Sequence, residues 1–253
     1  MFRPRIIPCL LLKDLGLVKT VKFKNPTYIG DPMNAIRIFN KKKADELIFL
    51  DINATLQKRK LDIKLISQIG EECTMPFAVG GGIKSMKDIE PLFTAGAEKV
   101  VINSAVTNDP SIIKMASNHF GTQSIIVSID LKKKLFGGYG IFSEGGKRLI
   151  NTSITEYIKI IEDHGAGEIF INSIDKDGTY SGYDLDLIKM ISSLVKIPVV
   201  ACGGASSMKD FKTAIIEGNA SAVAAGSMFV FHGKKRAVLI NYPSKQQKID
   251  LFK

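Results

Sequence analysis

Eight short apolar runs, rich in β-branched residues, recur along the chain, and each one predicts a β-strand. Hydrophobicity within a run is nearly continuous instead of alternating, which is typical of parallel strands that are buried on both faces. The predicted strands cover residues 5–12, 46–52, 77–79, 99–102, 124–130, 168–172, 198–201 and 220–225.

Amphipathic segments lie between these runs and predict helices. The predicted helices cover residues 32–42, 62–71, 86–94, 111–118, 154–163, 186–194 and 208–217. Strands and helices that alternate at this spacing indicate repeated βαβ units. Eight such units in 253 residues fit the size of a closed barrel, so we expect a single (β/α)₈ TIM barrel over residues 1–253.

The second half of the chain repeats the first at a constant shift of 122 positions, the distance that separates Glu46 from Glu168. At this shift the segment 81–88, which reads GGIKSMKD, falls on the segment 203–210, which reads GGASSMKD. The repeat is too long for one turn of a solenoid and predicts two half-barrels, at about residues 1–121 and 122–253. Neither half could bury the inner faces of its strands alone.

Composition and the N-terminal segment indicate the cellular compartment in which we expect the protein. Hydrophobic residues make up 45% of the chain, and no apolar run approaches the roughly 18–20 residues that span a bilayer. The apolar N-terminus is short and carries Arg3 and Arg5, and no small-residue cleavage site follows it. It therefore predicts a strand instead of a signal peptide, and we expect a cytoplasmic protein.

Cysteines and histidines are scattered through the sequence. Cys9, Cys73 and Cys202 form no Cys-x-x-Cys pair, and no histidine has a cysteine or carboxylate at ligand spacing. These spacings fit neither a disulfide framework nor a metal site. We expect no disulfide, no metal and no cofactor.

The net charge of +10 is dispersed along the chain. Its short basic runs, residues 41–43, 132–134 and 234–236, have no interleaved aromatics and no known nucleic-acid motif. We interpret the charge as solvated faces together with attraction for anionic small substrates. We expect neither a nucleic-acid nor a membrane partner.

Glycine-rich loops follow predicted strands at matching positions in the two halves, and a second polar loop follows one strand later in each half. Glycine lets the backbone approach a ligand closely, and backbone N–H groups beside a helix start favour an anion. We interpret the loops as two phosphate sites for a substrate with a phosphate at each end; the alternative is ordinary tight-turn chemistry. The loop residues are Gly81, Gly82, Asn103 and Ser104 in the first half, and Gly203, Gly204, Gly226 and Ser227 in the second.

Three carboxylates lie near the carboxyl ends of strands, where barrel enzymes carry their catalytic groups. Asp130 ends the fifth strand, Asp51 lies near the end of the second, and Asp177 lies in the loop after the sixth. We expect Asp130 and Asp177 to act as acid–base groups; the alternative for Asp177 is capping of the turn or of the next helix. Setting residues 9–13 on 128–132 places Leu11 opposite Asp130, and leucine cannot transfer a proton.

These motifs closely resemble the HisF family, the cyclase subunits of imidazole glycerol phosphate synthase, from Arg5 to about Phe231. The most specific stretches are residues 45–52 (DELIFLDI), 79–83 (VGGGI), 165–168 (GAGE), 173–184 (SIDKDGTYSGYD) and 202–205 (CGGA). The resemblance implies a (β/α)₈ barrel that docks a HisH-like glutaminase on its N-terminal face. It also implies that ammonia passes through the barrel to a doubly phosphorylated substrate. The implied reaction is a lyase-type cyclisation that gives imidazole glycerol phosphate and an aminoimidazole carboxamide ribotide.

Most residues with a role in the family have a match in this chain, and one of them is replaced. Its general-base aspartate matches Asp130, whereas its general-acid aspartate on the first strand matches Leu11. Cys9 on that strand and Lys19 of the substrate loop also match. The expected phosphate and substrate contacts are Lys19, Asp51, Gly81, Gly82, Asn103, Ser104, Gly178, Gly203, Gly204, Gly226 and Ser227.

The family's gate to the ammonia passage is a ring of charges at the bottom of the barrel, and all four of its positions match. They are Arg5, Glu46, Lys99 and Glu168. Inward charges at the starts of four strands would be costly singly, but two cation–carboxylate pairs satisfy one another. The alternative is a permanent salt-bridge plug that closes the barrel floor.

A chain that keeps the conduit and the phosphate loops but loses half of the catalytic pair resembles a paralogous branch of the family. That branch accompanies surface-polysaccharide gene products and is thought to make acetamidino sugars with a glutaminase and an N-acetyl sugar amidotransferase. The opening segment, residues 3–13 (RPRIIPCLLLK), and residues 18–26 (VKTVKFKNP) look like this branch.

Three other interpretations stay open. The chain could be a working cyclase of histidine synthesis that uses Asp130 with a substitute acid such as Asp14 or Asp177. It could be a scaffold that neither turns over a ligand nor passes ammonia. The sister aldose–ketose isomerase of the same pathway also has a two-half barrel, but it typically uses carboxylates on strands one and five, so Leu11 weakens that interpretation equally.

Overall fold

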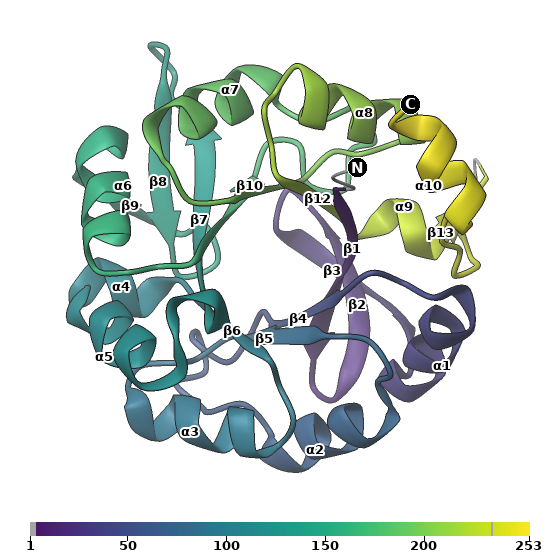
Figure 1. The fold of residues 1–253 in the computed structure, drawn as a ribbon, viewed down its shortest axis with the longest axis horizontal. Helices are drawn as coiled ribbons and strands as arrows, with labels where there is room; N and C mark the ends of the chain where they lie inside the picture. Colours follow the sequence, from purple (N-terminus) through teal and green to yellow (C-terminus); the bar gives the residue numbers. More distant parts are fainter. Residues whose placement is uncertain (1–3, 234) are drawn as a thin grey trace.

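Eight parallel strands surrounded by helices form a closed barrel in the computed structural model, which describes residues 4–233 and 235–253 (Figure 1). Arg3 of the opening segment and Lys234 of the last basic run lie outside the described residues. The barrel confirms the fold predicted from the alternation of apolar and amphipathic segments. No helix in the described ranges is long and apolar enough to cross a membrane.

The barrel strands agree closely with the predicted apolar runs. Successive barrel strands pair in parallel along the chain, including β7 with β10, and the pairing of β12 with β1 closes the ring. The eight strands are β1 (Arg5–Lys13), β4 (Leu47–Asp51), β5 (Phe77–Gly80), β6 (Lys99–Ile102), β7 (Ile125–Lys133), β10 (Glu168–Ser173), β11 (Val199–Cys202) and β12 (Ala222–Ala225).

Seven amphipathic helices cover the outside of the barrel, each with its apolar side against the strands, as the periodicity predicts. They are α1 (Pro32–Lys42), α2 (Ile63–Glu72), α3 (Met86–Thr94), α5 (Ser111–Phe120), α6 (Ile154–Asp163), α7 (Leu185–Leu194) and α8 (Met208–Ile216). The shorter helices are α4 (Ser104–Asn108), α9 (Ser227–Val230), α10 (Lys245–Leu251) and a 3₁₀ turn, Thr122–Ser124.

The matching segments of the two halves fold in the same way. Ser85 before α3 and Ser207 before α8 both form capping boxes with the acidic residue three positions later. Asp88 and Asp210 accept the backbone N–H groups that each helix start leaves free. The repeated Ser-Met-Lys-Asp sequence therefore begins a helix directly after each glycine loop.

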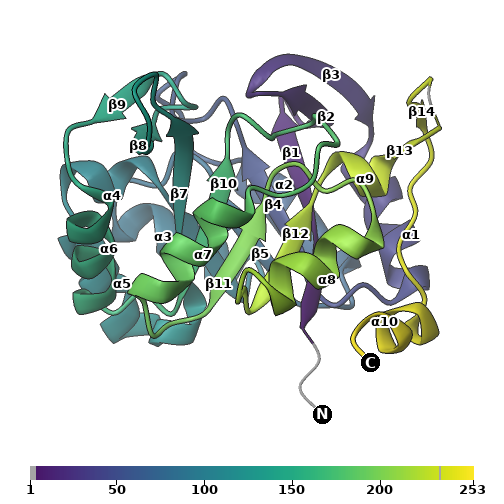
Figure 2. The ribbon, with the colours of Figure 1, turned by 90° about the horizontal axis from the view of Figure 1, so that it is seen from above.

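Two hairpins extend the sheet beyond the barrel. β2 (Gly16–Val21) and β3 (Lys24–Gly30) continue from β1, while β8 (Tyr139–Ser143) and β9 (Arg148–Ile150) continue from β7. Both hairpins lie at the carboxyl end of the barrel strands, whereas α10 and the start of β1 lie at the opposite end (Figure 2). A two-stranded sheet, β13 (Phe231–His232) with β14 (Ala237–Val238), follows α9.

The inside of the barrel is apolar between its two ends. Its buried residues make a cluster separate from the larger one between strands and helices. The inner cluster consists of Ile7, Cys9, Ile48, Ala78, Val101, Ile126, Phe170, Val200, Ala222 and Ala224. The residues singled out in the sequence lie at the two ends of this apolar cluster.

Candidate functional site

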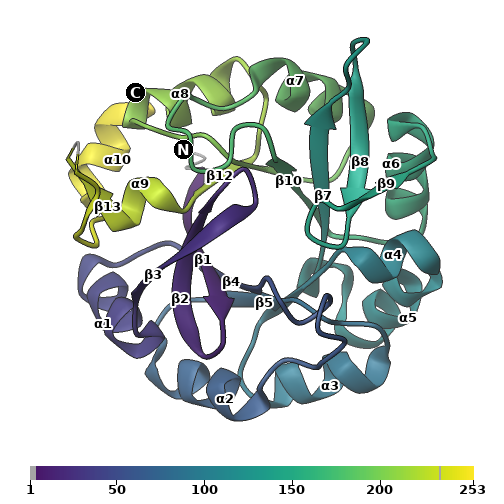
Figure 3. The same cartoon turned by 180° about the vertical axis from the view of Figure 1, so that it is seen from behind.

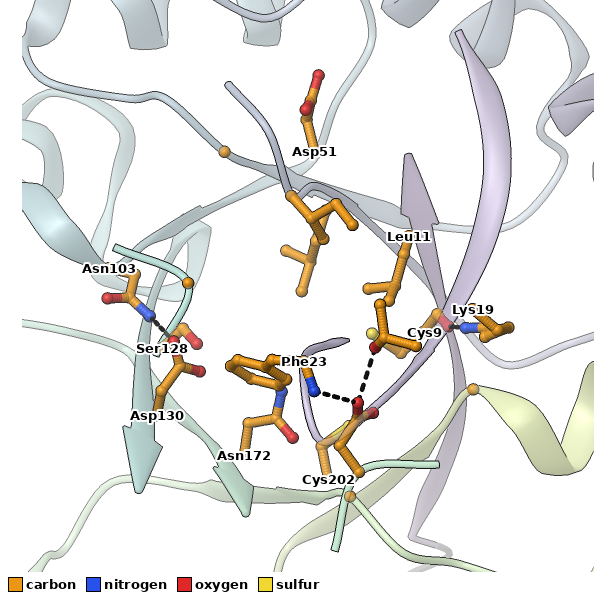
Figure 4. Close-up of a pocket in the computed structure, with 18 of the residues that line it drawn as sticks. Cys9, Leu11, Lys19, Phe23, Asp51, Asn103, Ser128, Asp130, Asn172 and Cys202 are labelled. Carbon is orange, nitrogen blue, oxygen red and sulfur yellow. Dashed lines mark hydrogen bonds between the residues drawn. The ribbon is translucent and has the colours of Figure 1, made fainter. Parts of the chain in front are cut away.

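One cavity of about 280 Å³ opens at the carboxyl ends of the strands, and it gathers the predicted site residues (Figure 4). Both proposed acid–base carboxylates line it, and so do all eleven expected phosphate and substrate contacts. Cys9 and Leu11 line it too. Residues as distant in sequence as Cys9 and Ser227 meet here because parallel strands present their carboxyl ends at one face of the barrel.

Asp130 lies in the wall of the cavity on β7, beside Asn172 of β10. Its side chain is buried, and one carboxylate oxygen accepts a hydrogen bond of 2.9 Å from Asn103 Nδ2. Burial raises the pKa of Asp130 to about 7, although the bond from Asn103 works against this, and the Asp177 carboxylate raises it further. A carboxyl group with this pKa can take up or release a proton near neutral pH.

Leu11 faces Asp130 across the cavity, as the alignment of the two halves predicts (Figure 4). Leu50 of β4, its partner in the sheet, lines the cavity next to it. Asp14, considered as a substitute acid, is exposed in the turn after β1 and lies outside this cavity. It borders a separate pocket beside the start of α2, so it cannot replace the missing carboxylate in this structure.

Asp177 lines the cavity, but its carboxylate is held by the β2–β3 hairpin. Thr20 Oγ1 and the backbone N–H of Phe23 both donate to Asp177 Oδ2, at 2.7 and 3.1 Å. The backbone N–H of Lys22 also donates to the Asp177 carbonyl, at 2.9 Å. Burial raises the pKa of Asp177, while these hydrogen bonds and the charge of Lys19 lower it in part. Asp177 therefore anchors the β2–β3 hairpin, which crosses the mouth of the barrel (Figure 3).

The first glycine loop has backbone geometry that only glycine adopts easily. Gly82 has a φ of +69°, and a Cβ there would come within 2.6 Å of the Arg59 carbonyl. Its N–H lies 3.3 Å from Thr55 Oγ1. Asn103 and Ser104 follow one strand later, where α4 begins. Lys147 of the β8–β9 turn lines the same cavity and adds a positive charge.

The loops of the second half include a buried cation beside Gly226. The Lys19 ammonium group donates to the Cys9 carbonyl and lies directly against Gly226, where any side chain would collide with it. Burial lowers the pKa of Lys19. Gly204, at φ +105°, lies against the Gly182 carbonyl, so a Cβ is excluded there as well. A lysine amongst glycine backbones is suited to bind an anion.

Asp51 was expected to contact substrate, and the structure gives it an additional structural role. Arg59 binds its two carboxylate oxygens at 2.7 and 3.0 Å. The backbone N–H groups of Asn53 and Ala54 donate to the same carboxylate, each at 3.0 Å. Asp51 thus fixes the loop after β4, beside Gly81.

The four predicted gate residues meet at the opposite end of the barrel. Arg5 donates to both Glu46 and Glu168, and Lys99 Nζ lies 2.9 Å from Glu46 and 3.6 Å from Glu168. Both glutamates are buried. The cations and carboxylates alternate around the ring, so each charge has two neighbours of opposite sign, and together they close the floor.

Sequence reasoning missed several residues of the mouth. They are Phe23, Lys147 and Tyr180, all of which line the cavity. Asn103 was predicted, but its hydrogen bond to Asp130 was not. The β-branched residues Val18, Thr20 and Val21 are the signal that could have revealed β2 and, with it, the approach of Phe23.

Comparisons with known proteins agree with this geometry. A family profile described as histidine biosynthesis protein matches residues 5–235. A provisionally named imidazole glycerol phosphate synthase subunit, hisF2 of Pseudomonas aeruginosa, is 53% identical over 96% of this chain and 97% of its own length. A provisionally named hisF3 subunit of Vibrio vulnificus is 46% identical over 98% of this chain and 96% of its own. The imidazole glycerol phosphate synthase subunit HisF of Hyphomonas neptunium is 43% identical over 91% of each.

Proposed function

Because the chain belongs to the HisF family of imidazole glycerol phosphate synthase subunits, we propose that it transfers ammonia from a partner to an acceptor. The partner is a HisH-like glutaminase that docks on the floor of the barrel. The acceptor is a phosphorylated small molecule at the mouth. The four-residue ring of Arg5, Glu46, Lys99 and Glu168 supports this proposal, since it lies where ammonia would enter.

The barrel interior is suited to neutral ammonia. Between the ring and the cavity it is lined by aliphatic, alanine and cysteine side chains together with Phe170. An ammonium ion would lose its hydration there without gaining a partner, whereas neutral ammonia loses far less. Ammonia can pass only when the ion pairs of the ring separate, since these ion pairs fill the floor of the barrel.

At the mouth, two glycine loops with Lys147 on one side and Lys19 on the other would bind the acceptor's phosphate groups. We propose that this acceptor belongs to acetamidino sugar formation in surface-polysaccharide synthesis, together with an N-acetyl sugar amidotransferase. The observation that carries this proposal is Leu11 facing Asp130 across the cavity. A cyclisation that needs an acid on the first strand, opposite the base Asp130, lacks that acid here.

Reconstitution tests the proposal. The purified chain is mixed with a HisH-like glutaminase and an N-acetyl sugar amidotransferase, and glutamine-dependent amidination is followed by mass spectrometry. We expect product from glutamine only when this chain is present, and product from added ammonium salt without it. Equal glutamine-dependent product in the absence of the chain would end the proposal.

A second candidate, an active cyclase of histidine synthesis, is favoured by the pKa of about 7 at Asp130, which suits a general base. Complementation of a cyclase-deficient histidine auxotroph separates the two candidates. We expect no growth despite expression of folded protein. Growth would assign the cyclase reaction to this chain.

A further inference from the structure

The hairpin that joins β7 to β8 ends in a tip that the proposed function does not use. We call residues 132–138 the tip; they read KKKLFGG. The tip stands clear of the ring of helices in two opposite views of the barrel (Figures 1 and 3). It lies on a continuation of the strand that carries Asp130, but outside the cavity.

The tip is a defined turn and not a loose loop. Gly137 N–H donates to the Lys134 carbonyl at 3.2 Å, and Lys134 N–H donates to the Gly138 carbonyl at 3.0 Å. Gly137 and Gly138 have φ values of +93° and +71°, which glycine adopts readily. Leu135 and Phe136 occupy the two central positions of the turn.

Leu135 and Phe136 are the most exposed large hydrophobic side chains of the described residues, at 91% and 97%. Single exposed apolar residues are ordinary, but two adjacent ones at the end of a projecting turn are not. Neither Leu135 nor Phe136 has a packing role in the barrel that would explain an apolar residue at this position.

Three lysines stand directly beside this apolar pair. Lys132 and Lys134 are exposed, and the described residues give neither of them an ion pair. Lys133 Nζ lies 3.9 Å from the Asp184 carboxylate and over the Tyr139 ring, so it is tethered at the base of the tip. Basic side chains that flank exposed leucine and phenylalanine are complementary to a surface with anionic groups outside and an apolar layer beneath.

We propose that the tip binds the surface of an anionic lipid membrane. Leu135 and Phe136 enter the headgroup boundary, and Lys132 and Lys134 contact lipid phosphates. A stable protein interface uses about 20–30 residues on each side, and the tip offers only residues 132–138, whereas shallow membrane insertion needs no more than such a tip. The proposal revises the expectation of no membrane partner and is independent of ammonia transfer.

Flotation of the intact chain with lipid vesicles tests it. One set of vesicles is pure phosphatidylcholine, and the other contains about 30% phosphatidylglycerol, enough to attract basic side chains at physiological salt. We expect wild-type protein to bind the anionic vesicles at least about tenfold more tightly. L135S/F136S should weaken that binding about tenfold or more, and K132Q/K134Q about three- to tenfold.

The matched control is K41Q/K42Q, which removes two exposed lysines from another basic run that has no exposed apolar neighbour. Its binding should stay within about twofold of wild type. Equal losses for the control and the lysine tip variant would mean adsorption by the dispersed charge of +10 and would overturn the proposal. So would no wild-type binding to anionic vesicles, or crosslinking of the tip to a protein without vesicle binding. Unchanged melting temperatures show that the exposed substitutions leave the fold intact.

Discussion

Asp130 holds its proton in the folded chain to a pH where most carboxylic acids have lost theirs. Its pKa is raised to about 7 mainly by burial, whereas an exposed aspartate ionises near pH 4. Between these two values the folded chain binds one proton more than the unfolded chain. Stability contributed through this group is therefore present at low pH and falls as pH rises toward 7.

Asp130→Asn tests this linkage, because asparagine keeps an acceptor for Asn103 but does not ionise. Between pH 4 and pH 8 we expect the wild type to lose up to about 4 kcal/mol of unfolding free energy through this group, at about 1.4 kcal/mol per pKa unit. The variant should lack that loss, so it gains on the wild type as pH rises. Urea unfolding at several pH values measures the difference. A constant difference at all pH values would contradict a raised pKa.

Leu11→Asp places a carboxylate opposite Asp130 inside the cavity. If the missing acid is what separates this chain from cyclase activity, the variant should let a cyclase-deficient auxotroph grow where the wild type does not. Leu50→Asp is the control, because it puts the same charge at the paired position of the neighbouring strand. Growth with both variants, or with neither, would show that position 11 does not decide the chemistry.

Among the structural elements, those with a continuous apolar or amphipathic pattern could be predicted from the sequence, and the hairpins could not. β6 and α1 have the predicted boundaries, because burial determines both their pattern and their ends. β3 has five exposed residues in succession and, within residues 4–233 and 235–253, pairs only with β2, so its pattern is no different from a loop. The sequence therefore predicts the cavity wall but misses Phe23 above it.

The β2–β3 hairpin should depend on its bonds to Asp177. Thr20→Val removes the 2.7 Å hydrogen bond to that carboxylate while keeping a β-branched side chain. Loss of one such bond to a charged group is worth about 1–3 kcal/mol, so amides of residues 16–30 should exchange with solvent roughly 5- to 100-fold faster.

Hydrogen exchange measured by mass spectrometry reports this change, with β1 as an internal reference. Thr27→Val is the matched control on the same hairpin, since Thr27 is exposed and has no side-chain hydrogen bond among the described contacts. Equal exchange in both variants would mean that Asp177 does not hold the hairpin.

At the scale of the whole molecule, strand order alone brings the site together. Alternating strands and helices predict a closed barrel, and closure places every strand's carboxyl end at one mouth and every start at one floor. Side-chain pairings within and between the loops at the mouth do not follow from this rule. Arg59 binds Asp51 within the loop after β4, and Thr20 of β2 binds Asp177 in the loop after β10; the sequence pattern does not specify the paths of these loops.

The floor ring joins four strands around the barrel, and its charges should be coupled in stability. Arg5→Met leaves Glu168 with Lys99 alone, at 3.6 Å, and should cost about 2–3 kcal/mol, since a buried carboxylate loses its main partner. Glu168→Gln in the same chain removes that stranded charge. The double variant should therefore be more stable than the sum of the two single costs predicts, by about 1 kcal/mol or more.

Urea unfolding of the four proteins measures this coupling energy. Arg37→Met and Glu72→Gln form the control cycle, because this ion pair lies between two outer helices with Arg37 largely exposed. Its coupling should stay below about 0.5 kcal/mol. If the two cycles gave the same small value, the ring would contribute no more than a surface pair. The floor could then part at little cost, and the ring would not hold the barrel closed until a partner docks.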